Sequence, residues 1–159
     1  MSDAHGNARL IDGLYSAFAR RDAAAMAACY APDARFTDPV FDVSGAEIGA
    51  MWAMLCARGK DLTLAWRDVE ADDATGRAHW EPRYTFSATG RPVHNVIDAT
   101  FAFREGRIVR HDDRFDLWRW SRMALGVKGM LLGWTPLVRN AVRAQARKGL
   151  DAWIARAGR

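Results

Sequence analysis

The chain has 159 residues, which is enough for one domain with a sizeable core. Hydrophobic residues make up 50% of it and charged residues 26%, the ordinary composition of a globular protein. The longest apolar run is far too short to span a bilayer, and residues 1–6 lack the basic and apolar pattern of a signal peptide. We therefore expect a soluble, cytoplasmic protein.

The net charge of +4 is distributed unevenly along the chain. Residues 1–118 carry 14 basic and 18 acidic side chains, whereas residues 119–159 carry nine basic side chains and one acidic. We divide the chain accordingly into a domain at 1–118 and a hydrophobic, basic extension at 119–159 that packs on the same domain. The basic charge belongs to the extension and does not by itself indicate nucleic acid, so we expect no nucleic-acid partner.

Apolar residues at three- and four-residue spacing predict helices in the first third of the chain. These helices are expected at 7–22, 23–30 and 44–59. Asp22 can cap the second helix, because a side-chain oxygen at that position accepts a free backbone N–H. Ser44, with Glu47 three residues later, forms a capping-box pattern at the start of the third.

From residue 61 onward, apolar residues recur at every second position, which predicts β-strands separated by turns. The expected strands lie at 62–66, 78–86, 93–103 and 108–117. Pro82 inside the second of these indicates a sheet edge or a bulge. Helices followed by such a run of strands predict an α+β fold, with N-terminal helices packed on a curved antiparallel sheet.

Asp38 lies at the end of a short strand that begins at Phe36, directly before Pro39. The residue before a proline is restricted to extended geometry, so this carboxylate is held at a rigid corner. Asp-Pro is also common in turns, and both a turn residue and a functional group fit this place.

The extension begins with an apolar segment that contains Trp118, Trp120 and Trp134. A helix is expected after Pro136, with a stripe of Arg139, Arg143 and Arg147 opposite its apolar face. Left undocked, the segment would form a large exposed apolar patch, which the chain's own body, a second subunit or a membrane could cover. We expect a homodimer with the extension packed over the body, and no membrane contact.

Three segments, LYSAF (14–18), YAPDARFTDP (30–39) and FAFREGRI (101–108), carry a family resemblance. They resemble the NTF2-like superfamily, and within it the ketosteroid isomerase and SnoaL-like polyketide cyclase branch. The resemblance implies a cone-shaped fold with an apolar pocket between the helices and the concave face of the sheet. It also implies cofactor-free proton transfer on an apolar carbonyl compound. The alternative is a non-catalytic ligand-binding or dimeric interaction domain with the same fold.

By this resemblance Asp38 is the proton-shuttling base and Tyr15 the tyrosine that stabilises an oxyanion. Because Tyr15 lies on an apolar helical face, ordinary core packing with a bonded hydroxyl is the slightly favoured interpretation of this residue. Asp98 is the only candidate for the protonated acid that the isomerases also use. Trp52 stands where those isomerases carry a second tyrosine, which is a departure from their pattern.

The orientation of Asp98 depends on the turn at Glu105 and Gly106. A two-residue turn there requires positive φ at both residues, which is unfavourable for Glu. A type I turn with Gly106 as a left-handed bulge avoids this and pairs Phe101 with Val109. We favour the bulge, although the other register would place Asp98 opposite Asp113 inside the pocket.

In the favoured register Asn95, His111 and Asp113 face the pocket and Asp98 faces away. His111 and Asp113 are two residues apart on one strand, so they project to the same side. A carboxylate beside an imidazole fixes its tautomer or favours its cation, as acid–base catalysis requires. A solvent-facing charged pair is the other interpretation.

We therefore name two sets of candidate site residues. The catalytic candidates are Tyr15, Asp38, His111 and Asp113. The substrate-binding candidates are Trp52, Trp80, Tyr84, Asn95 and Phe115. The spacing of His, Cys and acidic residues does not match a metal site, and no metal or cofactor is expected.

Overall fold

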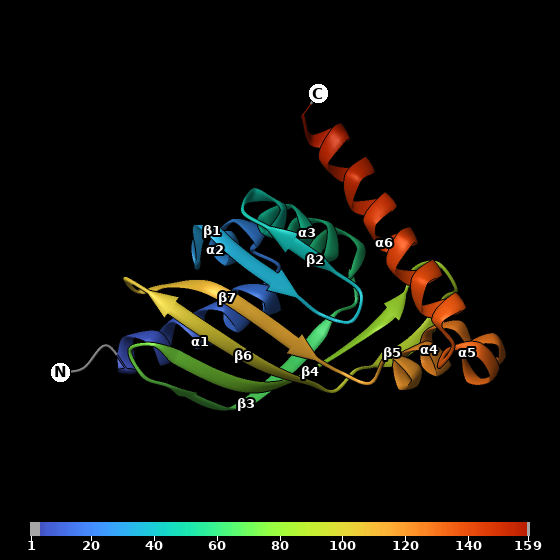
Figure 1. The fold of residues 1–159 in the computed structure, drawn as a ribbon, viewed down its shortest axis with the longest axis horizontal. Helices are drawn as coiled ribbons and strands as arrows, with labels where there is room; N and C mark the ends of the chain where they lie inside the picture. Colours follow the sequence, from blue (N-terminus) through green and yellow to red (C-terminus); the bar gives the residue numbers. More distant parts are fainter. Residues whose placement is uncertain (1–3, 159) are drawn as a thin grey trace.

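The computed structural model describes residues 4–158. Three helices, α1 (Ala4–Ala19), α2 (Ala23–Ala28) and α3 (Ala46–Arg58), pack on one face of a curved sheet (Figure 1). The strands of the sheet are β1 (Tyr30–Thr37), β2 (Asp42–Ser44), β3 (Thr63–Ala71), β4 (Thr75–Phe86), β5 (Arg91–His94), β6 (Ile97–Arg104) and β7 (Arg107–Arg114). Three further helices follow: α4 (Leu117–Leu125), α5 (Val127–Leu132) and α6 (Pro136–Ala157). The architecture is the α+β cone that the sequence predicts.

The helix starts follow the sequence signals in part. The Asp22 carboxylate accepts the backbone N–H of Ala25 at 3.0 Å, so α2 is capped as predicted. The capping box ahead of α3 is only half formed. The Ser44 N–H donates to Glu47 Oε1 at 3.5 Å, but Ser44 belongs to β2, and Gly45 is the cap residue. Pairing of β2 with β1 draws Ser44 into the sheet and away from the helix end.

The sheet is mixed and not purely antiparallel as predicted. Its strand order is β2-β1-β7-β6-β4-β3, with β5 also paired to β4. Only the β1–β7 pair is parallel among the pairs in the described chain. This pairing sets Phe36 next to His111, so the corner that follows β1 reaches the inner face of β7.

The strand predicted at 93–103 is two strands in the structure. β5 ends at His94 and β6 begins at Ile97, and β4 changes partner between them, from β6 at Trp80 to β5 at Arg83. Pro82 pairs regularly with Leu64 of β3, and on its other side it lies at this change of partner, where the missing N–H of proline interrupts no ladder. Pro82 is therefore at neither the predicted sheet edge nor a bulge but at a break between two partner strands, where the Asn95 N–H donates to its backbone oxygen.

The hairpin between β6 and β7 corrects our prediction of its turn. Glu105 has φ 52° and Gly106 has φ 75°, so both central residues are left-handed, as in a two-residue turn. The extra residue lies one step later. Phe103 pairs with Ile108 and Ala102 with Arg110, which leaves Val109 as a bulge.

The displaced bulge still orients β7 as predicted. Phe101 pairs with His111 and Ala99 with Asp113, so both polar side chains point into the core. Asp98 is 76% exposed on the outer face, where its carboxylate lies 2.9 Å from His79 Nδ1. The outward orientation of Asp98 is therefore correct, although the turn that we predicted to produce it is wrong.

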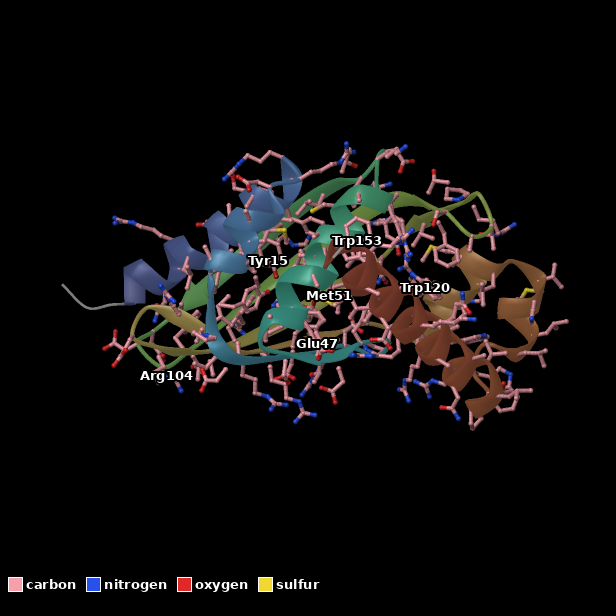
Figure 2. All side chains as sticks on the ribbon, turned by 90° about the horizontal axis from the view of Figure 1, so that it is seen from above. Tyr15, Glu47, Met51, Arg104, Trp120 and Trp153 are labelled. Atoms are coloured by element: carbon pink, nitrogen blue, oxygen red, sulfur yellow. The ribbon has the colours of Figure 1, made fainter. Side chains whose placement is uncertain are left out.

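The extension packs on the body at two places, through α4 against β5 and through α6 against α3. Figure 2 shows α6 lying beside α3, with the labelled Trp153 near Met51. Leu150 is fully buried in the main core, and Trp153 packs against that core. Arg147 forms ion pairs with Glu47 and Asp151. Among the described residues no helix is long and apolar enough to cross a membrane.

Substitutions in the β6–β7 turn test its geometry. Gly106→Val should lower the free energy of unfolding by roughly 1–2 kcal/mol, because a β-branched residue resists positive φ. A Cβ at Gly106 would meet no other atom within 4 Å, so the penalty is conformational and not steric. Glu105→Asn is the matched control and should be neutral or stabilising, since Asn tolerates this conformation. Urea denaturation measures both. Equal stabilities of Gly106→Val and the native chain would contradict the turn.

Candidate functional site

Asp38 forms a tight carboxylate turn at the corner after β1. Its Oδ1 accepts the backbone N–H groups of Val40 and Phe41, each at 2.6 Å, and its own N–H donates to Phe41 O at 2.9 Å. Pro39 lies inside this turn, as the Asp-Pro sequence predicts. The turn interpretation and the functional one are thus compatible, because only one of the two carboxylate oxygens is used.

The Asp38 carboxyl titrates in an unusual range for an aspartate. Burial raises its pKa from 3.8 to about 7, although the two backbone N–H groups act in the opposite direction. The negative charge of Asp113 raises the pKa further, and the Arg143 guanidinium lowers it. Asp38 therefore changes protonation near neutral pH, where a general base is most effective.

A chain of five polar side chains crosses the core from α3 to β4. The indole N–H of Trp52 donates to Tyr30 Oη at 3.1 Å, and Tyr30 Oη lies 2.8 Å from His111 Nδ1. On the other side of the imidazole, His111 Nε2 lies 2.9 Å from Asp113 Oδ1, which also accepts the indole N–H of Trp80 at 3.4 Å. His111 is fully buried and Asp113 nearly so. This settles their orientation: they form an internal pair and not a solvent-facing one.

The chemistry of these groups assigns the protons. An indole can only donate, so Tyr30 Oη accepts from Trp52 and has its own proton free for His111 Nδ1. His111 Nδ1 is then an acceptor, and the remaining ring proton on Nε2 is donated to Asp113. Every donor of the chain is satisfied in this arrangement, and the carboxylate is held in a fixed position.

Tyr15 lies in the same interior but has a different environment. Its hydroxyl is buried and has no hydrogen-bond partner among the described residues. Its pKa is raised well above 10, chiefly by burial and then by the nearby charges of Asp113 and Tyr30. Its ring centroid lies 5.4 Å from that of Trp80. Tyr15 is therefore a free donor close to the Asp113 carboxylate.

The extension covers the corner that holds Asp38. The guanidinium of Arg143 in α6 donates to the backbone oxygen of Pro39 at 2.8 Å. The indole N–H of Trp120 in α4 donates to Tyr84 Oη at 2.8 Å. Burial raises the pKa of Tyr84, and the charge of Asp38 raises it further. α4 and α6 thus contribute side chains to the surroundings of Asp38.

The structure brings most of the predicted site residues into one region. Trp52, Trp80 and Asn95 are buried, whereas Tyr84 and Phe115 are half-buried beside the extension. The Asn95 side chain accepts the N–H of Val96 at 3.1 Å, in the break between β5 and β6. Asp98 alone lies apart, on the outer face of the sheet.

The interior is filled by aromatic side chains. Trp52 packs edge-on against Phe18 and Phe36, with ring centroids 5.1 and 5.4 Å apart. Two surface hollows, of about 630 and 350 Å³, lie elsewhere. The first is lined by residues of β3, β4, β6 and β7, the second by residues such as Asp61, Arg83 and His94. Neither borders Asp38 or His111.

Three residues of this site were not among our predictions: Tyr30, Trp120 and Arg143. The helix predicted at 23–30 ends on Tyr30, but in the structure this residue begins β1. An earlier strand start would have drawn attention to its buried hydroxyl. The contacts of Trp120 and Arg143 depend on how the extension folds back, for which the sequence carries no local signal. Within residues 4–158 no group of His, Cys and acidic side chains could hold a metal ion.

Comparisons with known proteins agree with this architecture. A family model described as a SnoaL-like domain matches residues 11–111. The match begins in α1 and ends in β7, so it contains Asp38 and the buried chain except Asp113, and leaves the extension outside. No curated protein matches the chain.

Several solved structures share the fold. An NTF2-like protein of unknown function from Burkholderia pseudomallei is 23% identical, with a TM-score of 0.65 over 74% of this chain and 96% of that one. A candidate polyketide cyclase from Xanthomonas campestris is 24% identical, with a TM-score of 0.62 over 77% and 98%. A candidate ketosteroid isomerase from Kribbella flavida is 18% identical, with a TM-score of 0.58 over 73% and 82%. At these identities they establish the fold alone.

Two buried tyrosines provide a matched test of the buried chain. Tyr30→Phe leaves His111 Nδ1 and the Trp52 indole without a partner, so it should lower the free energy of unfolding by about 1–3 kcal/mol. Tyr15→Phe removes a hydroxyl that has no partner among the described residues and should be neutral or stabilising. Urea denaturation of both variants measures the difference. Equal losses at the two positions would contradict the assigned chain.

The raised pKa of Asp38 predicts a pH-dependent stability. Between about pH 4 and pH 7 the folded state binds a proton that the unfolded state has lost, so the free energy of unfolding falls as the pH rises. Asp38→Asn removes this decline. The variant should match the native chain below about pH 4 and exceed its stability by about 1–3 kcal/mol at pH 8, a value reduced for partial exposure.

Asp33→Asn is a control of opposite sign. The ion pair with Arg104 lowers the pKa of Asp33, so this substitution should slightly destabilise the chain at neutral pH and not at low pH. Denaturation at several pH values measures both differences. If Asp38→Asn lost stability as the pH rose, the raised pKa would be refuted.

Proposed function

The chain belongs to the SnoaL-like domain family, and we propose that it is a small-molecule enzyme that moves a proton on an apolar carbonyl compound without a cofactor. Asp38 is the general base of this reaction. The observation that carries the proposal is the pKa of about 7 of this carboxyl, at a corner surrounded by aromatic side chains. Similar folds in structures named for a polyketide cyclase and a ketosteroid isomerase agree with this class of chemistry.

The proposed reaction begins with ionised Asp38. Its carboxylate removes a proton from the carbon next to the substrate carbonyl, and the electron pair of that C–H bond moves to give an enolate oxygen. A hydrogen bond to this oxygen lowers the barrier, because charge develops there in the transition state. Protonated Asp38 then returns the proton to carbon, which leaves the enzyme unchanged.

We assign the hydrogen bond to the enolate to Tyr15. Its hydroxyl is one of two buried side-chain donors without a partner among the described residues, the other being Ser121 Oγ in α4, so donation to a ligand breaks no existing bond. His111 has both ring nitrogens engaged, and we assign it as a positioning residue that holds Asp113. Asp113 in turn contributes to the raised pKa of Asp38. Trp52, Trp80, Tyr84, Asn95 and Phe115 are assigned to substrate contact.

A non-catalytic ligand-binding domain is the second candidate function. The observation that favours it is that the two hollows described above do not border Asp38, so a ligand held in either of them would lie away from the proposed base. Under the catalytic proposal a substrate enters at the Asp38 corner, where α6 is held to Pro39 through Arg143. Movement of α6 and of the half-buried rings of Tyr84 and Phe115 provides that entrance.

Deuterium incorporation tests the proposed proton transfer over a whole class of compounds. A panel of apolar cyclic ketones and enones is incubated in heavy water with the native chain, and exchange at the carbon next to the carbonyl is followed by NMR. For a compound that exchanges, the rate should rise with pH through about 7 as Asp38 ionises. Asp38→Asn should abolish the exchange, and Tyr15→Phe should reduce it about 100-fold or more.

His79→Gln is the control, because His79 lies on the outer face of the sheet with Asp98. It should exchange at the native rate. Binding of a panel compound without exchange, at equal affinity in the native chain and in Asp38→Asn, would favour the ligand-binding alternative. Exchange that survives Asp38→Asn would refute Asp38 as the base.

A further inference from the structure

The extension exposes an unusual concentration of large apolar side chains, which we call the apolar platform. Its members are Trp118, Val127, Met130, Leu131, Leu132, Trp134 and Leu137. They are between 40% and 78% exposed, and Ile154 is the only other large exposed hydrophobic residue of the described chain. Exposed apolar side chains gathered in this way mark an interaction surface.

The packing of α5 shows that this exposure is built into the sequence. A Cβ at Gly129 would lie 1.9 Å from the backbone oxygen of Ser121, and one at Gly133 would lie 2.6 Å from the Ser121 side chain. α5 therefore lies against α4 through its glycines, and its large apolar side chains point to the solvent. An ordinary amphipathic helix would have the opposite arrangement, with apolar residues buried and small or polar residues exposed.

The charge around the platform is predominantly positive, although the exposed Asp116 caps α4 beside it. Residues 117–150 contain seven basic side chains and no acidic one. The body uses some of them, since Arg143 binds Pro39 and Arg147 pairs with Glu47. Lys128 in α5 and Arg139 in α6 are exposed and form no ion pair among residues 4–158. The Arg122 guanidinium lies 4.5 Å over the Trp118 ring.

We propose that the apolar platform docks this protein onto an anionic phospholipid surface. Tryptophan rings with leucine and methionine side chains enter the headgroup boundary, and lysine and arginine beside them meet lipid phosphate. The indole N–H groups of Trp118 and Trp134 donate to the backbone oxygens of Met130 and Leu131, so these rings can enter the headgroup boundary without leaving a donor unpaired. The helices α4 and α5 and the start of α6, which carry the platform, lie at the end of the molecule opposite the β6–β7 turn (Figure 1).

The charge pattern distinguishes a lipid surface from a second copy of the chain. Two platforms brought together would oppose basic side chains to basic side chains, without acidic partners in residues 117–150. Anionic lipid supplies the missing charge. Our sequence-based expectation that protein would cover this segment is met for Trp120, which is buried against the sheet, and for the face of α6 that contacts α3. The expected homodimer stays a prediction, and the platform is a poor surface for it.

Vesicle co-sedimentation with the native chain tests the proposal. Vesicles of phosphatidylcholine and phosphatidylglycerol in equal parts should bind the protein, with affinity that falls as salt is added, and vesicles of phosphatidylcholine alone should bind it weakly. Leu131→Asp, and separately the double variant Lys128→Glu with Arg139→Glu, should each weaken binding about tenfold or more.

Two controls match these changes in charge and polarity. Ile154→Asp introduces an acid at an exposed apolar position near the other end of α6, and Arg107→Glu reverses a charge at the β6–β7 turn. Both should bind the mixed vesicles within about twofold of the native chain, because neither touches the platform. Circular dichroism confirms that each variant is folded.

Two results would overturn the proposal. One is that the native chain does not bind mixed vesicles at low salt, or that Leu131→Asp binds them as well as the native chain does. The other is a native chain that is dimeric in solution, becomes monomeric on Leu131→Asp and does not bind vesicles, which would assign the platform to contact between copies. Neither outcome bears on the role of Asp38, since proton exchange is measured without lipid.

Discussion

The buried chain from Trp52 through Tyr30, His111 and Asp113 to Trp80 is the constraint on which the rest of this structure depends. It joins α3, β1, β7 and β4 across the core, so it ties the helical layer to the sheet. Polar groups buried in this way are costly unless every one is bonded. Each hydrogen bond adds little to the stability of the fold by its own strength. Its larger effect is that it leaves no polar group unpaired in the interior.

Burial is the main reason that the pKa of Asp38 lies above that of an ordinary turn aspartate, and this constraint adds to the effect. The chain fixes the Asp113 carboxylate on the inner face of β7, and the parallel pairing of β1 with β7 brings the Asp38 corner toward it. Two carboxylates in a poorly hydrated region oppose each other's ionisation. The fold thus holds the Asp38 carboxyl where its ionisation is unfavourable, and a carboxyl with such a raised pKa is typical of functional positions.

The extension contributes side chains both to the Asp38 corner and to the outer surface of the molecule. Its inner side supplies Trp120 and Arg143 to the surroundings of Asp38, while its outer side exposes the apolar platform. The same segment therefore contributes to two surfaces of different chemistry. Because the SnoaL-like match ends before α4, the contacts of the extension are additions to the cone that the family defines.

Local patterns in the sequence were sufficient for the three N-terminal helices and most of the period-two strands in outline, for the cap at Asp22 and for the inward direction of His111 and Asp113. These features depend on residues close together in sequence. In a strand, alternation fixes which side chains lie on the same face. Only the tertiary structure decided the parallel β1–β7 pairing, the bulge at Val109 and the partners of Tyr30, Trp120 and Arg143. Those contacts join residues far apart in sequence, and no local preference encodes which distant surface a strand or helix will meet.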